Sequence, residues 1–142
     1  LFACHDYSLD RLLGLLGTIQ SDATTPDTKL RRLILAFVDT ILNELHATAL
    51  TLNPESLSPP LLRRIIAKRD QFDHGLQAVI QQGIDQGVFA PGDPKMIEFA
   101  IMGAVNWIPK WFDPAGPLNA DQIGEAFDSY LVRGLMMRSA PA

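Results

Sequence analysis

Asp70 and His74 are the residues whose types and spacing come nearest to acid–base chemistry in this sequence. They lie four positions apart in a helical pattern, so one helix face would bring the carboxylate beside the imidazole. A hydrolase built on this pair would also need a nucleophile, but no serine lies in a Gly-x-Ser-x-Gly elbow. A solvated ion pair explains the same spacing. We therefore expect no catalytic residues and no enzyme.

Metal ligands and cofactor motifs are equally sparse. The three histidines, His5, His46 and His74, are scattered, and no two have the spacing of ligands on one helical turn. The sequence also lacks a glycine-rich phosphate loop. We expect no metal site and no cofactor. Cys4 is the only cysteine, which excludes an internal disulfide and indicates a reducing, cytoplasmic location.

One basic cluster has two interpretations. It consists of Arg63, Arg64, Lys68 and Arg69 within a single helical segment. The first interpretation is the solvated side of that helix. The second is recognition of an anionic group such as a phosphate, because Arg and Lys bind phosphate through charge-assisted hydrogen bonds. The sequence leaves both open.

Composition bounds the fold class. The 142 residues suffice for one domain, 47% of them are hydrophobic and 20% charged, and Val, Thr and Tyr are too sparse and unpatterned for a sheet. We predict an all-α bundle of about five to six helices. No apolar run reaches the roughly 18 residues that span a bilayer, so no membrane contact is expected. The net charge of −4 gives no overall field that attracts nucleic acid.

Apolar periodicity and capping signals place the helices. Leucines from Leu9 onward predict a first helix ending near Gln20. A second helix opens at Pro26 and is expected to break between residues 43 and 46, before Asn53-Pro54 closes the region. The longest helix begins at Ser58-Pro59 and stops at Gly87, which can adopt the left-handed conformation that ends helices.

The last two helices point to self-association. Asp93-Pro94 opens a helix that is apolar almost all round, and one small domain cannot cover every side of it. Pro109 is expected either to end that helix or to kink it. Asn119 and Gln122 form a capping box that opens the final helix. We therefore expect a homodimer with a four-helix interface. Its predicted residues are Ile108, Trp111, Phe112, Ile123, Phe127, Tyr130, Leu131 and Gly134.

Several packing motifs resemble the C-terminal half of TetR-family transcriptional regulators. They are Gly87-Val88-Phe89, Asn106-Trp107, Trp111-Phe112 and Arg133-Gly134-Leu135. The resemblance implies one effector-binding and dimerisation domain over residues 1–142. Residues 1–20 would be the connecting helix, 26–87 the pocket helices and 93–137 the dimerisation helices. The family's helix-turn-helix is absent before Leu9, so the chain looks like a fragment, and DNA contact would depend on that absent domain.

The family also implies a repressor that leaves DNA when a small, largely apolar molecule binds. Some relatives sense acyl-CoA thioesters, and the basic cluster at a cavity mouth would suit such a ligand. The residues expected to line the cavity are Phe37, Ile41, Phe72, Leu76, Val79, Met102, Asn106 and Trp107. The Asn106 amide could instead bond across the dimer. The rival interpretation is a helical carrier or protein-interaction module for a hydrophobic molecule.

Overall fold

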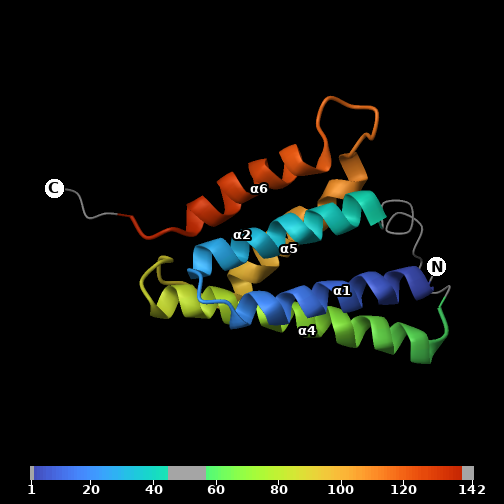
Figure 1. Cartoon of the computed structure of the whole chain (residues 1–142), viewed down its shortest axis with the longest axis horizontal. Coiled ribbons are helices and arrows are strands. Elements are labelled where there is room, and N and C mark those ends of the chain that lie inside the picture. Colours follow the sequence, from blue (N-terminus) through green and yellow to red (C-terminus); the bar gives the residue numbers. More distant parts are fainter. Residues whose placement is uncertain (1, 45–56, 139–142) are drawn as a thin grey trace.

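The computed structural model describes residues 2–44 and 57–138 and is all-helical there, which confirms the predicted fold class. Its elements are α1 (Phe2–Ser21), α2 (Pro26–Asp39), the π-helical turn η1 (Thr40–Glu44), α4 (Pro59–Asp85), α5 (Pro94–Trp111) and α6 (Ala120–Leu135). The helices run roughly along one axis and form an elongated bundle (Figure 1). None of them is both long and apolar enough to cross a membrane within the described residues.

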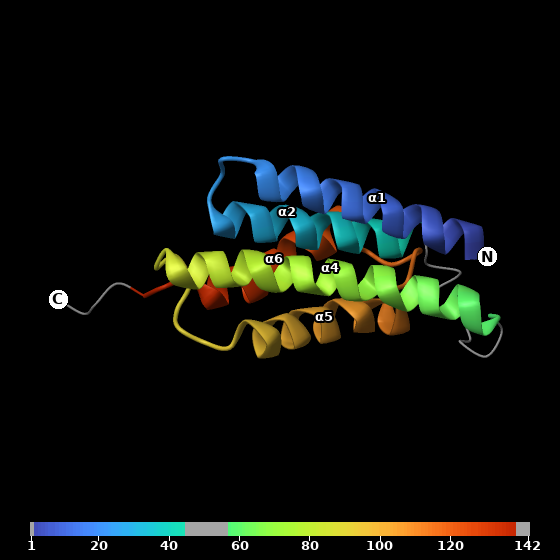
Figure 2. The same cartoon turned by 90° about the horizontal axis from the view of Figure 1, so that it is seen from below.

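Two helices form the centre of the bundle. α4 packs against α1, α2 and α5, while α2 packs against α1, α4 and α6. In the view from below, α1 and α5 lie on opposite sides of α4 (Figure 2). α1 and α4 run in the same direction, as the colours in Figure 1 show. The core therefore lies around α2 and α4, and the other three helices cover it.

The predicted starts of α2, α4, α5 and α6 agree with the structure. α2 begins at Pro26 and α4 at Pro59, each at a first position that needs no backbone N–H. The Asp93 side chain accepts a hydrogen bond from the Lys95 N–H at 3.0 Å. Asn119 and Gln122 complete the capping box with two hydrogen bonds of 2.9 Å.

Other boundaries differ from the prediction. α1 begins at Phe2 rather than after Ser8, because the buried stripe continues through His5 and Ser8, which are polar and so escape a hydrophobic pattern. The second helix changes to a π-helical turn at Thr40, slightly before the predicted break. The predicted closing of this region at Asn53-Pro54 lies outside the described residues.

Pro109 lies inside α5, which continues to Trp111. The helix therefore ends two residues after the proline, close to the predicted stop. Just after the end of α4, Gly87 has φ 72°, the left-handed conformation expected of it. The chain that follows pairs with the end of α6 through Ala90 N–H to Leu135 O (2.8 Å) and Met137 N–H to Val88 O (2.9 Å).

Glycines allow two close contacts on α4. A Cβ at Gly75 would lie 2.2 Å from Leu16 Cδ2, and one at Gly83 would lie 2.1 Å from Phe89 Cδ2. Phe89 is fully buried, so its ring has little room to move. These two positions therefore set how closely α1 and the turn after α4 approach the central helix.

We expect Gly83→Ala to lower the free energy of unfolding by about 1–3 kcal/mol, because the new methyl group displaces the buried Phe89 ring. Gly14→Ala is the matched control. A Cβ at Gly14 meets nothing within 4 Å, so alanine should raise stability by roughly 0.5–1 kcal/mol through helix propensity. Urea unfolding at one fixed protein concentration measures both, and equal effects would contradict the packing argument.

Candidate functional site

Six of the eight predicted cavity residues come together. Ile41, Phe72, Leu76, Val79 and Met102 are buried in one core cluster, and the partly buried Phe37 packs against it. The Phe37 and Phe72 rings stack with centroids 5.4 Å apart, which joins α2 to α4. The structure thus places an apolar centre between α2, α4 and α5.

Asn106 and Trp107 do not join this cluster, contrary to the prediction. Both are exposed, and Trp107 retains 61% of its surface. The buried side of α5 passes through Val105 and Ile108, and a helix advances about 100° per residue. The two residues between them must therefore face away from α4.

The predicted interface residues divide into three groups. Ile108 and Ile123 are buried within their own subunit, so they cannot form its outer surface. Three others are partly buried against the core, namely Phe112, Phe127 and Leu131. Trp111, Tyr130 and Gly134 are exposed, as an interface requires before association. Trp111 stacks on Phe127 with centroids 6.3 Å apart, which connects α5 to α6.

A continuous apolar strip runs along the solvent side of α5. We call it the α5 outer face, and it consists of Met96, Phe99, Gly103, Trp107 and Trp111, all exposed. Spacings of three and four residues align them on one side of the helix. The sequence indicated that α5 is apolar all round, but Trp107 was assigned to a cavity, and Met96, Phe99 and Gly103 were not among the predicted interface residues.

Two residues of the basic cluster of α4, Arg64 and Lys68, form ion pairs with α1. Arg64 lies 2.9 Å from Asp6, and Lys68 pairs with both Asp6 and Asp10, the latter at 2.7 Å. The hydrogen bonds that Lys68 donates to Asp10 and then to Asp6 raise the pKa of Lys68. These contacts hold the first turns of α1 on α4, a role that the sequence did not reveal.

His5 and Arg69 extend the same contact. His5 is buried, and its Nε2 lies 3.4 Å from Arg69 Nη2. Burial, followed by the charge of Arg69, lowers the pKa of His5, so the imidazole is neutral at pH 7. Arg63, by contrast, is exposed, as are Asp70 and His74. No group of three or more potential metal ligands is found in the part of the chain that the structure describes.

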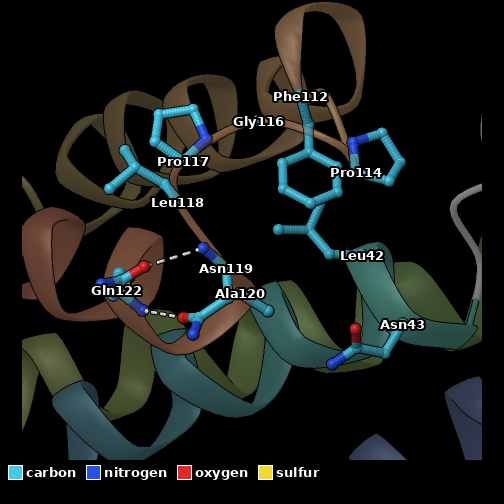
Figure 3. Close-up of a pocket in the computed structure, with 10 residues that line it drawn as sticks. All are labelled: Leu42, Asn43, Phe112, Pro114, Gly116, Pro117, Leu118, Asn119, Ala120 and Gln122. Carbon is cyan, nitrogen blue, oxygen red and sulfur yellow. Dashed lines mark hydrogen bonds between the residues drawn. The ribbon is translucent and has the colours of Figure 1, made fainter.

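A pocket of about 310 Å³ opens at the end of the bundle where α5 turns into α6. Figure 3 shows the Leu42 side chain directed toward the Phe112 ring, with Pro114 beside it and the Asn119–Gln122 capping box across the opening. None of the eight predicted cavity residues lines it. The pocket therefore lies apart from the six clustered residues, although Leu42 and Ala120, which line it, belong to the same core cluster.

Glu98 is the feature that sequence reasoning missed. It is 1% exposed on the side of α5 that faces α4, and its Oε2 accepts a hydrogen bond from Gln77 Nε2 at 3.5 Å. Its Oε1 has no hydrogen-bond partner in the described chain, which costs roughly 1–3 kcal/mol for a buried polar atom. The signal was present in the sequence, because Glu98 precedes Met102 by one helical turn on an apolar stripe.

Comparison with known proteins agrees with this architecture. Residues 23–135 match the family described as "Tetracyclin repressor-like, C-terminal domain". Because that match covers most of the chain, the protein belongs to this family of TetR-type C-terminal domains.

The chain is similar to the HTH-type transcriptional repressor KstR2 of Mycolicibacterium smegmatis, with 26% identity over 131 residues. That alignment covers 89% of this chain but 63% of KstR2, so the chain spans less than two thirds of this curated relative.

Two solved structures resemble the fold. A TetR/AcrR-family regulator from Thermobifida fusca has a TM-score of 0.83 and 28% identity, covering 94% of this chain and 72% of that one. AibR in complex with isovaleryl coenzyme A and operator DNA has a TM-score of 0.76 and 25% identity, covering 92% and 72%.

We expect Asp6→Asn to lower the free energy of unfolding by about 1–3 kcal/mol, because Arg64 and Lys68 lose a nearly buried carboxylate. Hydrogen exchange in the first turns of α1 should accelerate. Asp10→Asn is the matched control. The Asp10 side chain is 56% exposed, so its loss should cost less than about 1 kcal/mol. An equal response of the two variants would argue against Asp6 as the anchor of α1.

Proposed function

We propose that this chain is the effector-sensing and dimerisation part of a ligand-responsive TetR-type transcriptional repressor. DNA binding would belong to residues of the full-length protein outside this chain. The fold match to AibR, whose structure contains both isovaleryl coenzyme A and operator DNA, is the observation that carries this proposal. The similarity to the repressor KstR2 supports the direction of regulation.

The effector would enter the apolar centre between α2, α4 and α5. The six clustered residues offer aromatic rings, aliphatic side chains and one thioether, which together favour an apolar guest. An acyl-coenzyme A effector would also need cations for its phosphates. Arg64 and Lys68 already contact carboxylates on α1, so those cations would have to exchange partners.

Regulation would follow from the contacts of α4. An effector bound between α2 and α5 would favour one of two positions of α4. α1 would move with α4, because Leu16 lies against Gly75 and Lys68 binds Asp6. An effector shifts this equilibrium only by the difference between its affinities for the two conformations. The position of α1 would then set the spacing of two DNA-binding units.

A second copy of this chain is the proposed partner of the α5 outer face. The strip is too long and too apolar to be scattered surface residues, and Gly103 at its centre permits close approach of a second helix. Two-fold symmetry would place α5 against its counterpart, with the exposed Tyr130 of α6 at the edge.

Trp107→Glu should dissociate the dimer, because it places an unpaired carboxylate in an apolar interface. We expect the dimer dissociation constant to rise about 30-fold or more, which corresponds to about 2 kcal/mol. Sedimentation velocity over a concentration series measures this change. Ile66→Glu is the control, since Ile66 is exposed on α4 and lies outside the α5 outer face. Dissociation by both variants, or by neither, would refute this placement of the interface.

Met102→Trp should reduce effector binding while circular dichroism stays unchanged. The larger side chain fills the apolar centre, and overpacking of about 1–3 kcal/mol predicts a roughly 5- to 150-fold loss of affinity. Calorimetric titration with isovaleryl coenzyme A, and with free coenzyme A for comparison, provides the measurement.

Met137→Trp is the control for this titration, because Met137 lies beyond α6 and is exposed. Full affinity in Met102→Trp would locate the effector elsewhere, with the pocket of Figure 3 as the next candidate. No binding to the unaltered protein would exclude short acyl-coenzyme A thioesters as effectors.

A further inference from the structure

Glu98 occupies an environment that disfavours a charge. The carboxyl group lies between α5 and α4 and retains 1% of its surface. Its neighbours along the same side of α5 are apolar, namely Ile101, Met102 and Val105. Burial without a cation removes solvation that an ionised carboxylate needs. The location therefore favours the neutral acid.

A second carboxyl group lies within reach. Asp73 of α4 is close enough for its charge to act on Glu98. Gln77 donates to Glu98 Oε2, whereas the buried Oε1 has no hydrogen-bond donor in the described chain. Two ionised carboxylates cannot bond to one another, because each can only accept. A hydrogen bond between them requires one proton, which either group can carry. The burial of Glu98, its unpartnered Oε1 and the neighbouring carboxyl group of Asp73 together favour one proton held by the pair.

We propose that Glu98 and Asp73 form a proton-binding site in the α4–α5 interface, filled in acidic solution, and that the bound proton holds α5 on α4. Loss of the proton leaves two adjacent negative charges, one of them buried, and weakens this contact. The site does not depend on the proposed regulatory function, since the proton is its ligand. Neither residue of the pair lines the pocket of Figure 3.

The surrounding charges leave this pair without a dedicated cation. Burial and then the charge of Asp73 raise the pKa of Glu98 to about 7. Burial also raises the pKa of Asp73, with Asp70 acting in the same direction and Arg69 and His74 against it. Because one proton serves two groups, these values describe the pair.

Cations on the other elements are directed elsewhere. On α5, Lys95 lies over the Phe99 ring at 5.6 Å. On α2, Lys29 donates to Gln20 O, while Arg31 pairs with Asp128 of α6 at 3.2 Å. On α1, Asp6 and Asp10 are paired with Lys68. Among the described residues, the groups acting on Glu98 are therefore those of α4.

The sign of the pH dependence follows from the raised pKa. The stability contributed by the protonated pair is fully present below the ordinary Glu pKa of 4.5 and is lost as the pH rises through about 7. His5 acts in the opposite direction, because its pKa is lowered and charging it costs stability as the pH falls. A variant of Glu98 separates the two contributions.

Carbon-detected NMR of protein labelled at the Glu side-chain carboxyl carbons tests the site directly. The signal missing in Glu98→Gln identifies Glu98, and we expect its midpoint near pH 7. Asp73→Asn should shift that midpoint down by one unit or more, since it removes a negative charge and supplies a hydrogen-bond donor. Asp121→Asn, an exposed carboxyl on α6, should leave it unchanged. A Glu98 midpoint close to the ordinary value, or one insensitive to Asp73→Asn, overturns the proposal.

Thermal unfolding provides the second readout. Glu98→Gln keeps an uncharged hydrogen-bonding group, so its melting temperature should fall less than that of the unaltered protein between about pH 5 and pH 8. The melting temperature of Glu98→Gln minus that of the unaltered protein should therefore increase with pH. Parallel curves would show that Glu98 binds no proton in this range. If Glu98→Gln does not fold, the same comparison with Asp73→Asn decides the question.

Discussion

The packing of α4 against three helices is the constraint on which the rest of the structure depends. One side of α4 carries Lys68 and Gly75 toward α1, another carries Phe72 toward α2, and a third carries Asp73 and Gln77 toward α5. Because each side meets its partner through different chemistry, the three interfaces cannot exchange places. A displacement of α4 must therefore change its contacts with α1, α2 and α5 together.

α1 is held at two points of unlike character. Near its start, Asp6 accepts from cations of α4. Near its end, the buried Lys29 of α2 donates to Gln20 O and to Gln82 Oε1 of α4, at 3.2 and 3.4 Å. A lysine at a helix C-terminus is favoured by the helix dipole. Ion pairs at the start of α1 can exchange partners more readily than this buried contact, so the start is the end suited to move.

Local signals made most of the fold predictable. Pro26, Pro59 and the Asn119 capping box act through the chain nearby, so they mark helix starts without reference to tertiary structure. Prediction of the cavity and of the dimer interface required knowing which neighbour each side of a helix faces. Ile108 and Trp107 are neighbours and both apolar, yet one is buried and the other exposed. Periodicity cannot separate them when a helix is apolar all round, because the partner of each side is set by long-range packing.

Polar residues within the apolar stripes were harder to predict, and they determine much of the register between the helices. His5, Asp6 and Glu98 occupy core positions of α1 and α5 that a hydrophobic pattern passes over. Each meets a chemically matched group on α4, so α1 and α5 fit α4 in one register. Apolar contacts alone would tolerate a shift along the helix axis, whereas an unpaired buried carboxylate would not. The polar contacts that fix the register are also the contacts whose charge state or partner can change. Two conformations of the domain would therefore differ at the surfaces where α4 meets α1 and α5.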